Sequence, residues 1–409
     1  MSHAGKTSVV TLIMALASAA APVAQAQPPI RIGALISETG PSAVPAPNQL
    51  RGYQLCVKHT NEKGGVVGRK LELVVHDDGS DRATAGRLYE RLITRDKVDL
   101  VLGPYGSGIA DAAADVTEKH RMPLVAPTAT DSSLYKKGRK FIFSMQPPAE
   151  IVLEGLLDLA AKKGLRTVAL IHAEIGFGRA VTKGGTDLAK KKGLQVIFVD
   201  AYPRESTAFS TILTKVREAN PDVLGVASGG FEDLVSIIRQ MKASTVNPKM
   251  IGLTVGVELP KFYATLGRDA DFVYGVTAWL PELVDLRAGG LIPIARQYPG
   301  AREFVESYKR EFPGADLSQF SAAGYGGCQI LVEAIRRVGS LDSGKLRDAI
   351  SKMDHNTVFG GFRVDGSGVQ LAHKFLLFQW QGGKKVIVWP EELAPNTPRF
   401  PTPPWSQRP

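Results

Sequence analysis

The strongest constraint on the fold is the alternation of short β-branched runs with amphipathic helical stretches. Near the N-terminus this alternation predicts strands at Ile30–Ile36, Lys70–Asp77, Leu100–Gly103 and Leu124–Ala126, and helices at Asn48–Lys63, Asp81–Lys97 and 108–120. Such a βαβ series implies a parallel sheet covered by helices on both faces. The sequence therefore predicts an α/β fold.

The alternation starts again after Pro147-Pro148. This second series predicts helices at Ile151–Lys163, Arg179–Lys191, Phe209–Ala219 and Phe231–Lys242, and strands at Thr167–His172, Leu194–Asp200, Val223–Ala227 and Lys249–Leu253. Each series has the size of one α/β domain, so two lobes are expected.

The last third gives no clean third domain. It predicts a strand at Phe272–Trp279, helices at Ala301–Glu311, Ala322–Val338 and Leu346–Lys352, and a hairpin of Phe375–Trp380 with Val386–Trp389. The simplest account is that the chain crosses between the lobes several times. The Pro-rich segment 391–409 is predicted to be a loosely ordered tail.

The N-terminus has the features of a secretory leader. Lys6 precedes an apolar run, Val9–Val23, and Ala24-Gln25-Ala26 forms a small-x-small cleavage pattern. A signal peptide over residues 1–26, cleaved after Ala26, is therefore expected, and with it a periplasmic location. The alternative is a membrane anchor, but the run is short for a span and contains Pro22.

The charge pattern and the motifs limit the function. The formal charge is +10, but basic residues are scattered among acids, so nucleic acid is not an expected partner. No Walker, HExxH, CxxC or GxSxG motif is present. Neither His76 nor His172 has a second His or Cys at metal-ligand spacing. No metal, cofactor or catalytic residue is expected.

Six stretches, in register, resemble the leucine/isoleucine/valine-binding family of periplasmic type I solute-binding proteins. They are Ile32-Gly33-Ala34-Leu35, Thr39-Gly40-Pro41, the segment Asn61–Leu71 with its Gly64-Gly65 pair, His76-Asp77-Asp78-Gly79, Val101–Ser107, and Pro123–Thr130. The resemblance covers about residues 30–380. Any one of these motifs is weak, but six in the family's order are specific.

The resemblance implies two Rossmann-like lobes with parallel sheets, joined by three hinge strands, with ligand held in the cleft between them. The hinges are expected near Phe141–Gln146, Gly275–Pro281 and Val358–Arg363. Lobe one would comprise residues 28–143 and 277–358, and lobe two residues 144–276 and 359–390.

The chain has two cysteines, Cys56 and Cys328. An even count in an oxidising compartment is consistent with a disulfide, and two separate buried thiols are the alternative. The resemblance places the helices that carry both cysteines in lobe one. It therefore implies a Cys56–Cys328 disulfide.

The segment after the strand Leu100–Gly103 is the first candidate for ligand binding. Ligands of parallel α/β sheets bind beyond the carboxyl ends of strands. Tyr105, Gly106 and Ser107 lie at such an end, directly before a helix, where free N–H groups and a hydroxyl suit a carboxylate. The alternative is an ordinary glycine turn with Ser107 as helix N-cap.

The resemblance assigns roles to further residues. It implies that Ser107 binds the ligand's carboxylate, and that the Ala129 backbone and the Thr130 hydroxyl lie near its polar head. Thr130 could instead cap a turn. In lobe two, Phe177 and Phe231 match ligand-facing aromatic residues, although either could belong to the core.

One departure from the family bears on the ligand. Thr254 stands where amino-acid binders place an acidic residue that pairs with the ammonium group, and about Pro45 a family Tyr is missing. A desolvated ammonium without a carboxylate partner is costly. Glu174 and Glu258 do not align with the acid. Hydrophobic carboxylates, including aromatic acids, are therefore alternatives to branched-chain amino acids.

The sequence thus predicts an extracytoplasmic solute-binding protein of an ABC importer, which closes around its ligand by hinge motion. It is expected to act as a monomer that docks on an ABC permease. The rival hypothesis is a ligand-sensing regulatory module of the same fold. An enzyme is the least favoured possibility.

Overall fold

The first of two central sheets has five parallel strands. A computed structural model describes residues 1, 5, 27–285, 294–394 and 397–408. The strands are β1 (Ile30–Ile36), β2 (Leu71–Asp77), β3 (Leu100–Leu102), β4 (Leu124–Ala126) and β5 (Ile142–Ser144), in the order β2-β1-β3-β4-β5. The helices between them are α1 (Ala46–Glu62), α2 (Arg82–Thr94) and α3 (Ser107–Lys119). The strand order reverses direction between β1 and β3, which makes this pair the topological switch point.

Alternate residues of β1 serve opposite faces of the first sheet, because successive side chains of a strand point to opposite sides. Ile32 and Ala34 belong to the core under α1, whereas Leu35 packs into a separate core with α2 and α3. Helices therefore cover both faces, as the sequence predicted.

The second sheet has seven strands. They are β6 (Thr167–Ala173), β7 (Gln195–Tyr202), β8 (Val223–Ala227), β9 (Met250–Leu253), β10 (Tyr274–Thr277), β13 (Leu376–Gln381) and β14 (Lys384–Trp389), in the order β14-β13-β10-β9-β8-β6-β7. The predicted C-terminal hairpin is confirmed as the antiparallel pair β13–β14. The helices are α4 (Glu154–Lys162), α5 (Gly176–Lys191), α6 (Ser210–Ala219), α7 (Phe231–Ala243) and α8 (Pro260–Leu266). Because the chain goes from β6 out to β7 and back to β8, right-handed crossovers place α5 and α6 on opposite faces.

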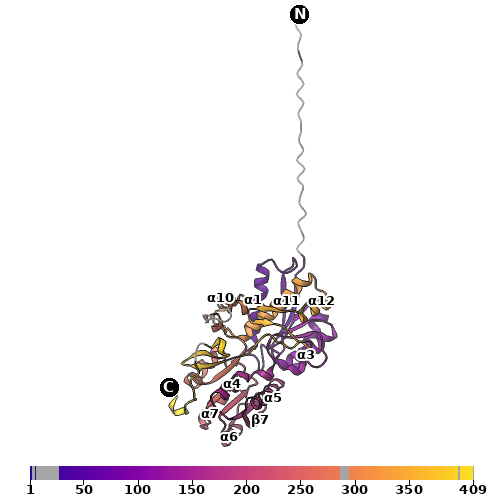
Figure 1. Cartoon of the computed structure of the whole chain (residues 1–409). Coiled ribbons are helices and arrows are strands. Elements are labelled where there is room, and N and C mark those ends of the chain that lie inside the picture. The colour runs from indigo at the N-terminus through magenta and orange to yellow at the C-terminus, as the bar shows by residue number, and fades with distance from the viewer. Residues whose placement is uncertain (2–4, 6–26, 286–293, 395–396, 409) are drawn as a thin grey trace.

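Each sheet with its helices forms one lobe, and Figure 1 shows the two lobes one above the other. Late segments of the chain return to the first lobe: α10 (Ala301–Glu311), α11 (Gln319–Val338) and α12 (Ser343–Ser351) lie beside α1 and α3. The described remainder includes α9 (Ile294–Gln297) and a small antiparallel pair, β11 (His355–Thr357) and β12 (Gly360–Phe362). The predicted α/β fold with two Rossmann-like lobes is therefore confirmed.

Helices α1 and α11 pack closely and are covalently linked. A β-carbon on Gly52 would lie 2.2 Å from the Ser321 carbonyl oxygen, and one on Gly324 would lie 2.4 Å from that of Gln49. Only glycine permits this approach on both helices. Cys56 and Cys328 form a disulfide between the same two helices, with their Cα atoms 6.2 Å apart, as the resemblance implied.

The segments that pass between the two sheets lie side by side. The Ser144 amide donates to the Gly368 carbonyl (2.8 Å), and the Gln370 side chain donates to the Met145 carbonyl (3.0 Å). His373 Nε2 lies 2.7 Å from the carbonyl oxygen of Ala278. The three predicted hinge ranges adjoin these passages, and the lobe bounds stay a prediction.

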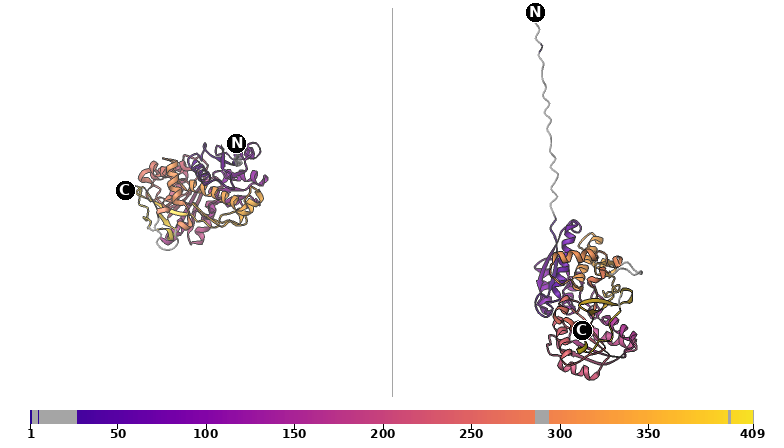
Figure 2. Two further views of the ribbon diagram at one scale, coloured as in Figure 1. Left: turned by 90° about the horizontal axis from the view of Figure 1, so that it is seen from above. Right: turned by 90° about the vertical axis from the view of Figure 1, so that its left-hand side faces the viewer.

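The Pro-rich tail is a correction to the sequence analysis. Over 397–408 it docks on the second lobe through hydrogen bonds: the Thr402 amide donates to the Lys249 carbonyl (3.0 Å), and Trp405 Nε1 donates to the Val246 carbonyl (2.9 Å). Figure 2 shows the C-terminus on this lobe. Composition predicted a loose segment because it does not reveal the partners that the backbone finds elsewhere.

Most of the predicted leader, residues 6–26, lies outside the described residues. Within the described ranges, none of the helices combines the length and apolarity needed to cross a bilayer.

Candidate functional site

A cavity of about 290 Å³ lies between the lobes. Its wall includes the loops after β1 and β3 of the first sheet and those after β6 and β8 of the second, together with residues that follow other strands of both sheets. Strands β1, β3, β6 and β8 flank the switch points of their sheets. At a switch point the connections turn to opposite faces of the sheet, and a crevice forms at the carboxyl ends of the two strands. The fold itself therefore creates the site.

The loop Gly103–Ser107 is held in place from behind by α1. Gln49 Nε2 and the Tyr53 hydroxyl both donate to the Gly103 carbonyl, at 2.9 and 2.7 Å. Thr128 completes the support: its hydroxyl donates to Gln49 Oε1 and accepts from the Gly106 amide. Gly106 has a φ of +80°, a conformation that favours glycine. The loop is thus preorganised before any ligand arrives.

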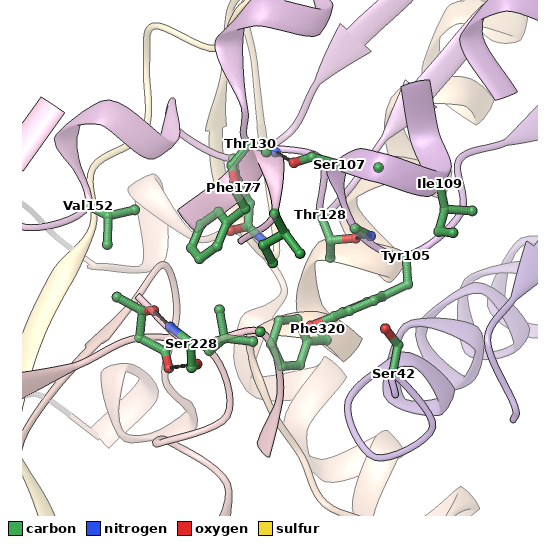
Figure 3. A pocket seen from close by; sticks show the side chains of 18 of the residues that line it. Ser42, Tyr105, Ser107, Ile109, Thr128, Thr130, Val152, Phe177, Ser228 and Phe320 are labelled. Atoms are coloured by element: carbon green, nitrogen blue, oxygen red, sulfur yellow. Dashed lines mark hydrogen bonds between the residues drawn. The ribbon is translucent and has the colours of Figure 1, made fainter. Parts of the chain in front are cut away.

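Ser107 is the first residue of α3 and does not cap it, because the N-cap residue is Gly106. Its hydroxyl oxygen accepts hydrogen bonds from the backbone amides of Thr130 and Asp131, at 3.0 and 3.1 Å. No acceptor for the hydroxyl proton is found among the described residues, so it can donate toward the cavity. Figure 3 shows Ser107 and Thr130 together at one side of the cavity. Ser107, which the resemblance assigned to the carboxylate, and Thr130, which it assigned to the ligand's polar head, are therefore adjacent.

Tyr105 lies across the cavity beside Phe320, with an edge-to-face contact and ring centroids 5.3 Å apart (Figure 3). From the second lobe, Phe177 faces the cavity and is half-buried in the first turn of α5. Thr254 also belongs to the wall, but its hydroxyl is engaged: it accepts from the Ser228 amide and donates to the Val226 carbonyl. Tyr105, Gly106, Ser107, Thr130, Phe177 and Thr254 are thus brought together.

Two predicted residues are not at the cavity wall. Ala129 is fully buried, and its carbonyl already accepts from the hydroxyls of Tyr135 (2.6 Å) and Ser144 (3.3 Å). Phe231 is 2% exposed at the start of α7, where it packs into the core under Lys261. The resemblance assigned both residues to the ligand. In the structure the Ala129 carbonyl and the Phe231 side chain contact other protein groups instead of the cavity.

The sequence analysis missed much of the wall. The additional residues come from loops on both lobes and from the passages between them: Ser42, Ser80, Arg82, Gly108, Ile109, Thr128, Gln146, Val152, Ile175, Gly176, Arg204, Ser228, Gly229, Val255, Val276, Gln319, Phe320 and Phe375. Only proximity in the fold identifies them, although Phe320 and Phe375 could have been suspected as aromatic residues beside predicted elements.

The charge of the wall is one-sided. Among the described residues, the only charged side chains that line the cavity are Arg82 and Arg204, and no carboxylate lines it. Glu174 is exposed outside the wall. Glu258 is 1% exposed behind the wall, where its two oxygens accept from Gln319 Nε2 and the Gly256 amide, both at 3.0 Å. Burial raises the pKa of Glu258, which disfavours its charged form.

The described residues contain no group of three or more His, Cys, Asp or Glu side chains that could hold a metal ion. The site is therefore characterised by its hydroxyls, its arginines and its apolar wall.

Solved structures share the fold. One is a branched-chain amino acid transporter substrate-binding protein, LivJ, from Streptococcus pneumoniae in complex with isoleucine (TM-score 0.77, 22% identity, 88% of this chain and 100% of that one). Another is an ABC transporter solute-binding protein from R. palustris in complex with benzoate (TM-score 0.73, 20% identity, 88% and 95%).

Curated relatives cover nearly the whole chain. A Leu/Ile/Val-binding protein homolog 7 from Brucella abortus is 25% identical over 405 residues (95% of this chain, 98% of the relative). A homolog 8 from Brucella suis is 26% identical over 408 residues (95% and 97%). The profile of the family described as periplasmic binding protein matches residues 29–385. Membership implies a location outside the cytoplasm, and the chain belongs to the periplasmic binding protein family.

Proposed function

We propose that this protein is the substrate-binding component of an ABC importer, and that its ligand is a small organic acid with an apolar body and no ammonium group. The lobes would close around the acid and present it to a membrane permease. The ligand would be bound and released unchanged. Cleavage of the leader after Ala26 would free the protein in the periplasm.

The observation that carries this proposal is the absence of any carboxylate among the described residues of the wall. An ammonium group that leaves water needs an anionic partner, and without one its burial is strongly unfavourable. Thr254 cannot take that role, since a hydroxyl is neutral and this one is bonded to the β8 backbone.

The cavity suits the carboxylate and the apolar body of such a ligand. A carboxylate beside Ser107 and Thr130 would meet the free hydroxyl proton of Ser107 and the N-terminus of α3, both of which favour negative charge. Val152, Ile175 and Phe177 supply an apolar surface for the body of the ligand. The relatives support both ligand classes, because one structure of this fold holds isoleucine and another holds benzoate.

The test is a calorimetric comparison of acids that differ only in the amino group. Ligand-stripped protein would be titrated with leucine against 4-methylpentanoate, and with phenylalanine against 3-phenylpropanoate. We expect the acid without the amino group to bind more tightly in each pair. Thermal unfolding provides a second measurement, because a ligand that binds only the native state at 100 times its Kd stabilises it by about 2.7 kcal/mol.

Tighter binding of leucine and phenylalanine would contradict the proposed ligand class and favour an amino-acid carrier. Absence of binding by every acid and amino acid would contradict the assignment of this cavity as a carboxylate site.

A further inference from the structure

The wall of the cavity includes a second set of polar side chains besides Ser107 and Thr130. They belong to Ser42, Ser80 and Arg82 of the first lobe and Arg204 of the second. Figure 3 shows Ser42 and Ile109 on the far side of Tyr105 from Val152. The carboxylate at Ser107 in the proposed function does not require these residues, so their presence needs a separate explanation.

Arg204 follows β7 and lines the cavity from the second lobe. A β-carbon on Gly229 would lie 3.8 Å from Arg204 Cγ, and one on the neighbouring Gly230 would lie 3.3 Å from the Pro41 carbonyl oxygen across the cleft. Since Pro41 precedes Ser42 and Gly229 precedes Gly230, Arg204 and Ser42 line the cavity from neighbouring parts of the two lobes. The electrostatics agree: burial and the charge of Glu258 raise the pKa of Tyr105, while Arg204 opposes that rise.

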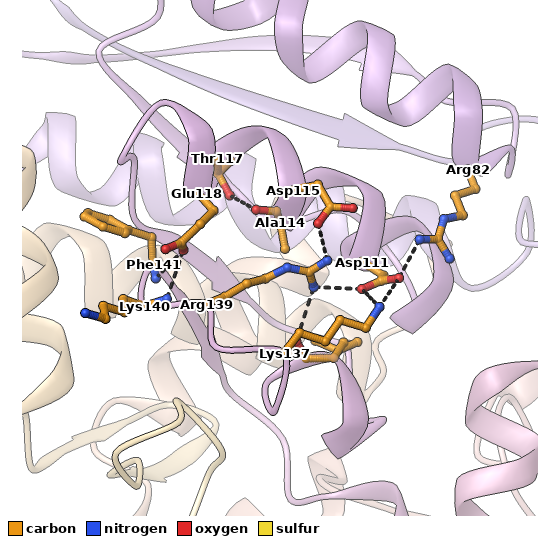
Figure 4. Close-up of polar contacts among 11 residues, drawn as sticks. Arg82, Asp111, Ala114, Asp115, Thr117, Glu118, Lys137, Arg139, Lys140 and Phe141 are labelled. Atoms are coloured by element: carbon orange, nitrogen blue, oxygen red, sulfur yellow. Dashed lines mark hydrogen bonds and ion pairs between the residues drawn. The ribbon is translucent and has the colours of Figure 1, made fainter.

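Arg82 is held in position from the first lobe by Asp111, at 2.5 Å (Figure 4). The same carboxylate also binds Lys137 and Arg139, both at 2.7 Å, and Arg139 pairs further with Asp115. Three cations thus share two carboxylates. Arg82 is the member of this network that lines the cavity, and its side chain is 57% exposed.

Ser42 supplies a donor. It is 8% exposed, and its hydroxyl, which points into the cavity in Figure 3, has no hydrogen-bond partner among the described residues. The hydroxyl is therefore available to donate to an anionic ligand group. Ser80 is different, because its hydroxyl donates to the Thr39 carbonyl (2.8 Å) and accepts from the Ser42 amide (3.1 Å). Ser80 therefore holds Ser42 in place.

We propose that Arg204, Arg82 and Ser42 form a second anion-binding subsite, and that the ligand is a dicarboxylic acid with an apolar spacer. One carboxylate lies at Ser107 and Thr130, and the other between the two arginines. Closure of the lobes brings Arg204 to a carboxylate already held by the first lobe, so the second acidic group helps to stabilise the closed form. This inference rests on the proposed function, since it concerns the same cavity.

The test uses ligands of matched shape. The mature protein would be titrated with benzoate, the three phthalate isomers, and monomethyl terephthalate, which keeps the size of terephthalate but has one charge fewer. We expect at least one dicarboxylate to bind about 10-fold or more tightly than benzoate, and terephthalate to bind more tightly than its monomethyl ester if its spacing fits.

Variants separate the subsite from general charge. Arg204→Gln should remove the advantage of the dicarboxylate over benzoate, whereas Arg217→Gln, which removes one exposed charge from α6 of the same lobe, should keep it. Because Arg204 is exposed, the ligand-free variant should unfold at the wild-type temperature. Ser42→Ala should reduce the same advantage.

The outcomes are distinct from those of the proposed function. Equal affinity for benzoate and every phthalate isomer would overturn the second subsite while the carboxylate site stands. An advantage that survives Arg204→Gln would overturn it too. Failure of benzoate and all the dicarboxylates in a protein that still binds 4-methylpentanoate or 3-phenylpropanoate would overturn the second subsite alone, whereas failure of those acids as well would contradict the proposed function.

Discussion

At the scale of single residues, the proposed carboxylate site depends on Ser107. Ser107→Ala removes the free proton that faces the cavity and leaves the amides of Thr130 and Asp131 without their acceptor. We expect binding of the preferred acid to weaken by about 1–3 kcal/mol, measured by calorimetry. Ser133→Ala, at an exposed position of the adjacent loop, is the control and should bind normally. An unchanged affinity in Ser107→Ala would remove this residue from the site.

Some residues of the cavity wall could be picked out from the sequence because their motif implies a particular backbone geometry. Gly106 and Ser107 were found because a glycine and a small hydroxyl residue precede a helix at a strand end. Arg204 was missed because β7 is an edge strand and its loop carries no motif. The resemblance placed Phe231 at the ligand, but a match in sequence position does not show which way a side chain points. At the first position of α7, the Phe231 side chain is buried in the core.

At the scale of elements, the disulfide between α1 and α11 closes a loop of 272 residues. Replacing both cysteines with alanine should lower the free energy of unfolding by about 2–5 kcal/mol, measured by denaturant titration. A reducing agent should lower the stability of the wild type and leave that of the double variant unchanged. Equal stability of the oxidised wild type and the variant would contradict a stabilising role.

The docked tail provides a second prediction for an element. Gln379 is fully buried, and its amide both donates to and accepts from the Arg399 backbone, each at 2.8 Å. A chain that ends at residue 394 loses these bonds and the packing of Trp405. We expect the loss of these hydrogen bonds, at about 0.5–1.5 kcal/mol each, and of the Trp405 packing to lower the Tm.

Ligand affinity of the truncated chain should stay at the wild-type value, because no tail residue lines the cavity. A chain that ends at Arg408 is the control, since it keeps every tail hydrogen bond described. A truncated chain as stable as this control would show that the docking contributes nothing.

Element-level prediction depended on length and pattern. Val223–Ala227 and Ala301–Glu311 have the predicted bounds, and most other predicted elements differ by a few residues. The short elements α8, β11 and β12 were missed, because three to seven residues seldom show a period and their structure comes from tertiary contacts. The start of α5 was placed three residues late, since Gly176 and Gly178 are weak helix formers.

At the scale of the whole molecule, the two-lobe fold was accessible from the sequence because the βαβ alternation occurs twice. The residues that line the cavity could not be predicted from the sequence in the same way. Its wall includes Gln146, Val276 and Phe375, which lie next to three separate strand ends where the chain passes between the sheets, Val276 near the end of β10. Periodicity locates strands, but it does not show which distant segments meet. Two of these passages are joined by a single buried side chain.

That side chain is His373, which is fully buried where its Nε2 meets the Ala278 carbonyl, with its ring stacked on Phe359 (centroids 4.5 Å apart). Burial lowers the pKa of His373 to about 4, from a model-peptide value of about 6.5. Between about pH 4 and pH 6.5, His373 is therefore protonated in the unfolded chain and neutral in the folded chain. The stability from this group is complete above about pH 6.5 and is lost as the pH falls toward 4, by up to about 3 kcal/mol.

The measurement is the free energy of unfolding of the wild type and His373→Gln at several pH values between 4 and 8. Carboxyl groups titrate in both chains, so the difference between the chains isolates the histidine. The variant should lose packing at every pH, but its deficit should shrink by about 3 kcal/mol as the pH falls from 7 to 4. A deficit that stays constant over this range would mean that the passages accept a charged His373, and that burial there does not oppose protonation.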